Sequence, residues 1–457
     1  MLCLTLWLAG TVPAHAVCYV DGRATGGRDN GTSWTDAYVT LPSALANAAC
    51  AEIWVAKGIY KPTSGSDPTI SFDIRPGVPV YGGFAGGETS RFDKDPSANP
   101  TVLSGDIDAN DALSGGAGID ATPDDIVGTN SHHVVTMDGT KGMLVDSDTV
   151  LDGFVITGGD AVSADRPWGG GLYCNGAGAG NGCSPVLLRL VFRGNRALWG
   201  GALFNDGSHG GSTFGGYNGL FFSGNRALAG GGAVLNDGES GGSSNPSFDN
   251  TTFAGNQAQN GGAVYNSGSG GTASPQFQNV TFVGNAAGAD GGALFDDARI
   301  GDSGPLLLNV TIAGNSAGRA GGAIANVGSG VASGSALALH NAILWSDSAP
   351  FDAEIHNDTA TAAADFSLIA GGCPSGTVCH AVLSSDPGLG RLGRYGGFTP
   401  TLRPVATSPA IDYGEDTGCP FSDQRGVLRP QGAHCDLGAV ERKAVEDVLF
   451  QDGLERF

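Results

Sequence analysis

The sequence predicts an all-β protein built as a solenoid: a single-stranded parallel β-helix with an N-terminal helical cap and a small C-terminal domain. Two observations lead to this fold class. A unit of about 30 residues repeats between Phe192 and Asn326, and side chains of one kind recur at fixed places within it. Self-similarity at such a period is typical of stacked-repeat architectures. Because a solenoid grows along one axis, 457 residues do not require several globular domains.

Two short tags define each repeat. The first is Phe-x-Gly-Asn, with Ile in place of Phe in the last copy, and the second is Gly-Gly-Ala followed by an aliphatic residue. A parallel β-helix needs one such side chain per coil, because its strands stack about 4.8 Å apart with like residues in register. The first tag begins at positions 192, 222, 253, 282 and 312, and the second at 200, 231, 261, 291 and 321.

The repeated columns have structural interpretations. Apolar columns such as Phe253, Phe282 and Ile312 should fill the core, and the glycine pairs permit positive φ or close backbone approach. Asparagine tolerates left-handed backbone and can stack amide to amide at bends. Two such columns are expected: Asn250, Asn279, Asn309 and Asn341, and separately Asn205, Asn236, Asn266 and Asn326 with Asp296 and Asn175 in register.

One column of the repeat should face away from the core. It follows the aliphatic core column by one residue, so the period of two in a strand turns it outward. We expect either an exposed, ligand-binding apolar stripe or a surface covered by the Gly/Ser-rich loops that come next, such as residues 206–212. The column consists of Phe204, Leu235, Tyr265 and Phe295.

The ends of the chain differ from the repeat. Residues 1–16 combine an apolar run with Ala14-His-Ala16, which predicts a secretory signal peptide. Residues 17–63 should hold the cap and first strand, with a cap at 34–49 that contains a short helix capped by Asp36, and a strand at 53–56. The β-helix is expected at 64–384, with regular coils at about 165–345. Residues 385–442 change in composition, and a tail with a short sorting motif follows at 443–457.

The net charge disfavours a nucleic-acid-binding or membrane-binding protein, and the cysteine content favours an exported protein with disulfides. The formal net charge of −22 makes nucleic acid and anionic membranes unfavourable partners. No later segment offers the 18 or more apolar residues of a membrane span. Removal of Cys3 with the signal peptide leaves eight cysteines, which in an exported chain favour disulfides over a metal site. Many connectivities are open, but proximity in sequence favours Cys18–Cys50, Cys174–Cys183, Cys373–Cys379 and Cys419–Cys435.

Residues with the chemistry of a site are sparse. Asp106, Asp108, Asn110 and Asp111 resemble the opening of a calcium loop, but the Gly at its sixth position and the Glu at its twelfth are missing. We therefore favour a solvated acidic turn over a calcium site and expect no other cofactor. Asp206 and Asp237 align one coil apart, and turn chemistry explains them. No catalytic residue is assigned.

The paired tags resemble those of polymorphic outer-membrane-type proteins and of bacterial right-handed parallel β-helix proteins in the pectate-lyase-like superfamily. The N-terminal runs Asn30-Gly-Thr-Ser-Trp34, Ile53-Trp-Val-Ala56 and Val80-Tyr-Gly-Gly-Phe84 are similar to the second group. The resemblance implies a right-handed helix and display at the cell surface. The superfamily also contains polysaccharide lyases and hydrolases.

Residues 385–442 resemble the choice-of-anchor domain that follows β-helices in secreted bacterial proteins. The resemblance is carried by Asp386-Pro-Gly-Leu389, Gly396-Gly-Phe-Thr-Pro-Thr401 and Cys435-Asp-Leu-Gly-Ala-Val-Glu441, in this order. It implies attachment or sorting at the cell envelope and no chemistry.

Together these features favour an exported, non-catalytic β-helix protein, secreted or displayed at the bacterial cell surface or outer membrane. Its expected role is adhesion or carbohydrate interaction, with a polysaccharide or a host or cell-surface molecule as partner. One alternative is a polysaccharide lyase or glycoside hydrolase of the pectate-lyase-like superfamily. Another is a purely structural component of an envelope or matrix. The oligomeric state and the ligand's identity do not follow from the sequence.

Overall fold

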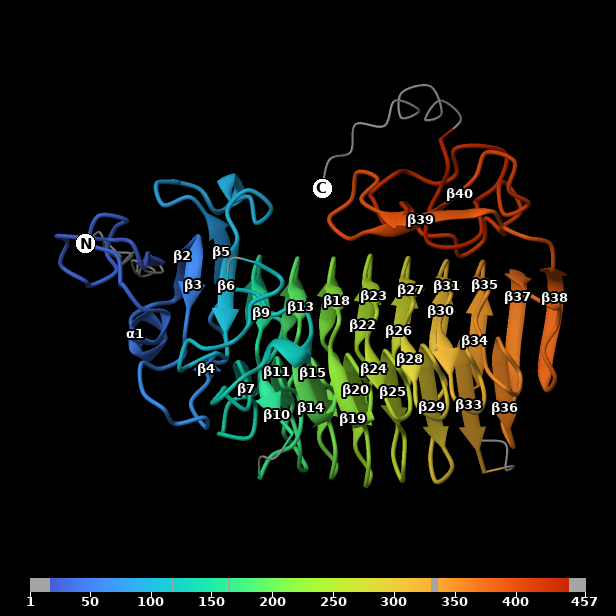
Figure 1. The fold of residues 1–457 in the computed structure, drawn as a ribbon, viewed down its shortest axis with the longest axis horizontal. Helices are drawn as coiled ribbons and strands as arrows, with labels where there is room; N and C mark the ends of the chain where they lie inside the picture. Colours follow the sequence, from blue (N-terminus) through green and yellow to red (C-terminus); the bar gives the residue numbers. More distant parts are fainter. Residues whose placement is uncertain (1–16, 117, 163–164, 330–335, 444–457) are drawn as a thin grey trace, which may run out of the picture.

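The protein is a right-handed parallel β-helix whose coils stack along the long axis of the molecule (Figure 1). The computed structural model describes residues 17–116, 118–162, 165–329 and 336–443. The predicted signal peptide and all but the first residue of the predicted tail lie outside the described residues. Within those ranges, no helix is long and apolar enough to cross a membrane.

Three sheets form the walls of the helix, and each coil contributes strands to them in turn. The largest sheet has two parallel rows of strands, because most coils enter it twice, on either side of a tight turn. Its strands are β1 (Val17–Val20), β2 (Glu52–Ala56), β3 (Gly58–Tyr60), β5 (Val80–Phe84), β6 (Thr101–Ser104), β8 (Val150–Asp152), β9 (Val155–Thr157), β12 (Val186–Leu188), β13 (Val191–Arg193), β17 (Gly216–Asn218), β18 (Phe221–Ser223), β22 (Ser247–Asp249), β23 (Thr252–Ala254), β26 (Gln276–Gln278), β27 (Thr281–Val283), β30 (Leu306–Leu308), β31 (Thr311–Ala313), β34 (Leu337–His340), β35 (Ile343–Trp345), β37 (Ala362–Ile369) and β38 (Thr377–Leu383).

The other two walls are smaller. The six-stranded sheet comprises β10 (Asp160–Ala161), β14 (Arg196–Trp199), β19 (Arg226–Gly230), β24 (Gln257–Ala258), β28 (Ala286–Ala287) and β32 (Ser316–Ala317). The nine-stranded sheet comprises β4 (Phe72–Asp73), β7 (Val135–Asp138), β11 (Leu172–Asn175), β15 (Leu203–Asp206), β20 (Val234–Asp237), β25 (Val264–Ser267), β29 (Leu294–Ala298), β33 (Ile324–Gly328) and β36 (Ile355–Asp358). In the loops, β16 (Ser212–Thr213) pairs with β21 (Ser243–Ser244).

The glycine pairs turn the chain between the six- and nine-stranded sheets. The first glycine of each pair has a positive φ, for example 61° at Gly261. The second glycine lies so close to the next coil that a Cβ on Gly262 would approach the carbonyl oxygen of Gly292 to 2.2 Å. Both positions therefore need glycine, for different reasons. This result confirms the interpretation of the tag.

The core is built from aligned columns, as predicted. Phe192, Phe222, Phe253 and Phe282 are fully buried and stack face to face, with ring centroids 4.8–4.9 Å apart. Stacked rings gain about 0.5–1.5 kcal/mol per pair beyond their burial. The aliphatic column after the glycine pairs, Leu203 to Ile324, is also fully buried.

The best-bonded asparagine ladder is one that the sequence analysis did not single out. It is formed by the last residue of each Phe-x-Gly-Asn tag, namely Asn195, Asn225, Asn256, Asn285 and Asn315. Each side-chain Nδ2 donates to the Oδ1 of the next Asn at 2.9–3.0 Å, and Asn315 donates to Asp347 at 2.8 Å. All five are buried.

The two predicted ladders differ from expectation in detail. Asn205, Asn236, Asn266 and Asp296 bond in series at 2.6–2.8 Å. Asn175 is not in that column, because β11 pairs with β15 so that Cys174 lies beside Asn205. The other column has the expected positive φ at Asn250, Asn279, Asn309 and Asn341. Its amide-to-amide hydrogen bonds are longer and weaker, with N···O distances of 3.4 Å.

The C-terminal domain accounts for that second difference. Its hairpin of β39 (Leu389–Gly393) and β40 (Thr401–Pro404) lies over the upper edge of the later coils (Figure 1). Asn279, Asn309 and Asn341 donate their side-chain nitrogens to its carbonyl oxygens at 2.8–3.1 Å. Inside the domain Arg429 and Glu441 form a fully buried ion pair at 2.9 Å. The asparagines of this column thus hold the C-terminal domain against the β-helix.

The N-terminal cap is shorter than predicted. Helix α1 spans Leu41–Ala46, and its N-cap is Thr40, whose hydroxyl accepts from the Ser43 backbone N–H. The prediction of Asp36 as N-cap was wrong, because the Asp36 carboxylate accepts instead from the Arg28 backbone N–H. Leu41, Ala44 and Leu45 are buried in the main core, so the helix covers the open end of the first coil. The 3-10 helices η1 (Arg91–Asp93) and η2 (Pro123–Asp125) lie in later loops.

Four disulfides close local loops. The pairs are Cys18–Cys50, Cys174–Cys183, Cys373–Cys379 and Cys419–Cys435, which are those favoured by proximity in the sequence. Each links an irregular segment to itself or to an adjoining strand. They therefore fix the parts of the chain that the repeat does not hold.

Asp296 should make folding pH-dependent. It is fully buried in an asparagine ladder, and burial raises its pKa to about 7. The folded protein keeps a proton that the unfolded chain releases near pH 4, so this contribution to stability is lost as pH rises from about 4 to about 7. We expect Asp296→Asn to be more stable than wild type above pH 7 and similar to it near pH 4, measured by denaturant unfolding.

The exposed Asp358 of β36 offers a control with the same change in net charge. Asp358→Asn should leave the pH profile of stability unaltered. Parallel profiles for wild type and Asp296→Asn would contradict the assignment of a proton to the ladder.

Candidate functional site

The predicted outward column lies on the nine-stranded sheet. Phe204, Leu235, Tyr265 and Phe295 occupy consecutive strands in register, and Tyr173 precedes them in the same column. All are turned away from the core, yet each is less than 10% exposed. Trp168 and Trp199 pack against the column. The column is therefore a covered apolar floor, and it is not an open stripe.

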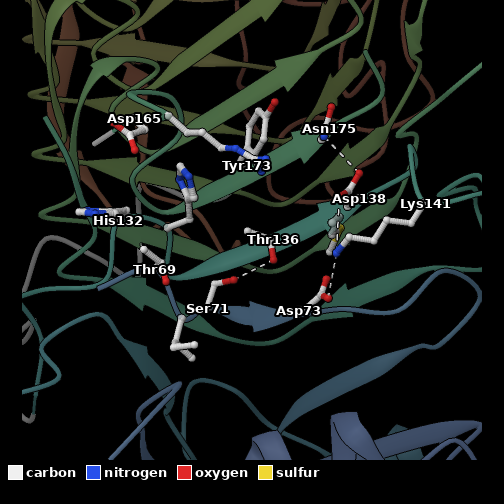
Figure 2. A pocket seen from close by; sticks show the side chains of 14 residues that line it. Thr69, Ser71, Asp73, His132, Thr136, Asp138, Lys141, Asp165, Tyr173 and Asn175 are labelled. Carbon is white, nitrogen blue, oxygen red and sulfur yellow. Dashed lines mark hydrogen bonds and ion pairs between the residues drawn. The ribbon is translucent and has the colours of Figure 1, made fainter. Parts of the chain in front are cut away.

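Two adjoining cavities lie over this sheet. The first, of about 500 Å³, covers β4, β7 and β11, and Figure 2 shows its lining. The second, of about 590 Å³, has Phe204, Leu235 and Tyr265 in its lining. The two share Arg166, Tyr173 and Asn175. We call them together the groove.

Tryptophans form one side of the groove. Trp168 and Trp199 stand directly before glycine pairs on neighbouring coils, and their backbones form a parallel bridge. The Trp168 ring lies 5.8 Å from the Phe204 ring, and Trp199 meets Tyr265 edge-on at 5.9 Å. Both indoles are partly exposed. They give the groove flat apolar surfaces that remain open to solvent.

The opposite side is polar, because the last residue of each strand in the sheet falls there. Five consecutive strands end in register on this side, with Asp138, Asn175, Asp206, Asp237 and Ser267. Asn175 donates to Asp138 at 3.1 Å, and Ser267 donates to Glu239 at 2.8 Å. The groove therefore offers a row of acceptors opposite a row of aromatic rings.

Tyrosine hydroxyls hold some of these carboxylates and leave one without such a donor. Tyr173 donates to Asp206 on the next coil at 2.8 Å, and Tyr265 donates to Asp297 on the next coil at 2.9 Å. Phe204 occupies the same position before Asp237 and has no hydroxyl. Burial raises the pKa of Asp237 to about 7, and the nearby carboxylates of Glu239 and Asp206 add to the effect. Asp237 can thus carry a proton near neutral pH.

Charge in the groove is mostly negative. In the first cavity Lys141 lies 3.3 Å from Asp73 and 3.5 Å from Asp138, as the dashed lines of Figure 2 mark. Burial lowers the pKa of His133 to about 4, so this ring is neutral at physiological pH. The two cavities together are lined by six carboxyl groups against two cationic side chains: Asp73, Asp138, Asp165, Asp206, Asp237 and Glu239 against Lys141 and Arg166.

The four residues of the suggested calcium loop are not brought around one point. Asp108 and Asn110 are exposed, and Asn110 donates to Asp108 at 3.1 Å. Asp106 and Asp111 are buried in separate contacts, with Lys61 and with Asn130. No cluster of three or more His, Cys, Asp or Glu side chains in the described part of the chain is arranged to hold a metal ion.

Sequence reasoning missed the polar and tryptophan sides of the groove. Tyr173 could have been found, because Gly169-Gly170-Gly171-Leu172 before it is a degenerate copy of the glycine tag. Trp168 and Trp199 share one place before that tag, which was a second signal. The lining of the first cavity comes from irregular coils before residue 166, where no repeat reveals the register.

Comparisons with known proteins found a family model and solved structures that are similar to this chain. Residues 250–267 match the model of the Chlamydia polymorphic membrane protein repeat. A solved structure described as the crystal structure of pectate lyase Pel9A is similar, with 16% identity, a TM-score of 0.48 and coverage of 93% of this chain and 96% of that chain. No curated protein matches the chain.

The two tyrosine–aspartate bonds allow a matched test. Tyr173→Phe leaves the buried Asp206 with bonds from Ser208 alone, whereas Tyr265→Phe leaves Asp297 paired with Arg299. We expect Tyr173→Phe to lower the free energy of unfolding by about 1–3 kcal/mol, and Tyr265→Phe to lower it by less. Urea unfolding at neutral pH measures both. A larger loss of unfolding free energy in Tyr265→Phe than in Tyr173→Phe would contradict the conclusion that Asp206 depends more on its tyrosine than Asp297 does.

Proposed function

We propose that the protein is an exported β-helix protein that binds an extended, uncharged polysaccharide in the groove without cleaving it. The observation that carries the proposal is the pairing of aromatic rings on one side of the groove with carboxylate, amide and hydroxyl groups on the other. Binding sites for small organic ligands typically combine an apolar lining with a few placed polar groups. A sugar ring has one apolar face and a rim of hydroxyls, so it matches such a surface.

The length of the groove suits a polymer. Its lining comes from β4, β7, β11, β15, β20 and β25, which are six consecutive strands of the nine-stranded sheet. Strands stack about 4.8 Å apart, so these six span about 24 Å along the axis. This length accommodates a chain of several sugar units. A single monosaccharide would leave most of it unfilled.

The charge of the groove favours a neutral polymer. Six carboxyl groups face two cationic side chains there, and the whole chain carries a net charge of −22. Like charges brought together across an interface cost several kcal/mol. A polyuronate or another acidic glycan would meet this repulsion, whereas hydroxyls can donate to the carboxylates without it.

Display outside the cell is part of the proposal. It is supported by the four disulfides, which are characteristic of oxidising compartments, and by the match of residues 250–267 to the repeat of polymorphic membrane proteins. The resemblance of residues 385–442 to the choice-of-anchor domain and the predicted signal peptide point the same way. An adhesive role follows if the bound glycan belongs to another cell or to a matrix.

Hydrolysis of the bound glycan is the second candidate. It is favoured by Asp237, whose pKa of about 7 would let it act as a proton donor beside Asp206 on the neighbouring strand. Glycosidases pair one protonated and one ionised carboxyl in this way. The strands set the two residues about 4.8 Å apart. Hydrolysis would take place in the same groove, and it differs from the first proposal only in that the bound glycan is cleaved.

Binding to a panel of neutral and acidic polysaccharides tests the proposal. We expect affinity for a neutral member and a loss of about tenfold or more in Trp199→Ala, because the indole forms an open face of the groove. Phe92→Ala removes an exposed ring outside the groove and should bind like wild type. Preference for an acidic polymer, or undiminished binding by Trp199→Ala, would overturn the proposal. A panel that stays blank would favour a purely structural role.

The same incubations separate binding from cleavage. New reducing ends that appear with wild type and vanish with Asp237→Asn would support the hydrolase. Unsaturated products would support a lyase. Tight binding with neither product supports the non-catalytic role.

A further inference from the structure

The loop between β6 and β7 buries more acidic side chains than its cations balance. Asp106, Asp111 and Asp120 are each less than 10% exposed, and Asp120 is fully buried. Lys61 lies 3.7 Å from Asp106. Among the described residues, no ion pair joins Asp111 or Asp120 to a cation, and the nearby Arg196 is engaged with Asp160. Burying unpaired charge is costly, so this group needs an explanation.

The Asp120 carboxyl accepts no hydrogen bond from an N–H group or a hydroxyl. The polar side chain that it faces is a second carboxyl, that of Asp111, although the Asp120 backbone N–H donates to the Thr157 hydroxyl at 3.0 Å. The side-chain oxygen of Asn130, which is also buried, has no partner either. Buried polar atoms nearly always have partners in native proteins. Two facing carboxyl groups and an unpaired amide oxygen beside them make a set of oxygens that a cation can bind.

These side chains converge on one place. A Cβ built on Gly158 would lie 2.6 Å from Asp120 Oδ2, 3.2 Å from Asn130 Nδ2 and 3.4 Å from Asp111 Oδ2. Asn130 Nδ2 also lies 2.7 Å from Asp111 Oδ2 and 2.6 Å from the Gly158 carbonyl oxygen. Glycine at position 158, with a φ of 71°, leaves the space between them open.

We propose that this space binds a calcium ion, held by the carboxylates of Asp111 and Asp120, the side-chain amide oxygen of Asn130 and the carbonyl oxygen of Gly158. A half-turn of the Asn130 amide exchanges its nitrogen for the unpaired oxygen. Calcium takes six to eight oxygen ligands from carboxylates, amides, backbone carbonyls and water, and it accepts irregular geometry. Two carboxylates suffice here because neutral oxygens complete the set.

The site differs from the one suggested by the sequence, of which only Asp111 belongs to it. The other ligands come from later in the loop and from the turn after β9, so only folding assembles them. The ion would tie the loop to that turn. The loop continues directly into His132 and His133, which line the groove, but the proposal does not depend on any function of the groove.

Thermal unfolding of the full chain, freed of metal by a chelator, tests the site in calcium chloride and in magnesium chloride at equal concentration. Ligands that bind the folded state alone raise its stability. We expect the midpoint to rise by a few degrees with calcium and by less with magnesium, which resists dehydration. Equal shifts with both salts would show only screening of the net negative charge and would overturn the proposal.

Asp120→Asn and Asp108→Asn complete the test. Asp120→Asn replaces one of two facing carboxyl groups by a neutral amide that can donate to Asp111, so without metal it should be at least as stable as wild type, while the response to calcium should vanish. Asp108→Asn, in the same loop but outside the site, should keep the full response. Calcium titration by calorimetry should show one site in wild type and in Asp108→Asn, and none in Asp120→Asn. An unchanged response in Asp120→Asn would contradict the proposed ligands.

Discussion

The register of each coil on the next is the constraint on which the whole molecule depends. In the ladder from Asn195 to Asn315, every amide oxygen after that of Asn195 accepts from the side chain of the preceding Asn and from its backbone N–H, at 2.9–3.1 Å. These groups are buried, so a coil displaced by one residue would leave several unpaired at about 1–3 kcal/mol each. The ladder thus permits one alignment.

The fixed register also arranges the outward-facing side chains of successive coils in rows, and these rows form the groove. Residues that recur in every coil are used inside, where phenylalanines stack and glycine pairs turn the chain. The outward positions vary from coil to coil, and the register still places them in rows. Tyr173 can reach Asp206 only because their strands are aligned residue by residue, and the same alignment sets Trp168 beside Trp199. The groove is therefore a product of a repetitive core with a non-repetitive surface.

The sequence predicted what repetition or proximity reveals. The core columns, the positive φ of Asn250 and its equivalents, and the four disulfide pairs could be read in this way. The sequence did not show that the tag asparagines form the strongest ladder, since any fixed position could have been the bonded one. The length of the cap was overestimated, because the apolar pattern at 34–49 continues beyond the six residues that are helical.

The sites were harder to predict, for a physical reason. Asp120, Asn130 and Gly158 belong to segments of irregular length, and no period relates their positions. Their convergence depends on how the loop after β6 closes against the next coil. The same holds for the first cavity, to which β4, β7 and β11 bring residues more than 100 positions apart. Only the part of the groove over regular coils carried a signal, in the column from Phe204 to Tyr265.

A crystal structure with a neutral oligosaccharide of about six sugars, soaked at saturating concentration, tests the central claim most directly. That claim is that the aligned rings and strand-end acceptors form one continuous glycan site. We expect sugar rings against Trp168 and Trp199 and hydroxyls within hydrogen-bond distance of Asp206 and Asp237. A glycan bound at another face, or a groove that stays free of sugar while the protein binds it in solution, would contradict the account.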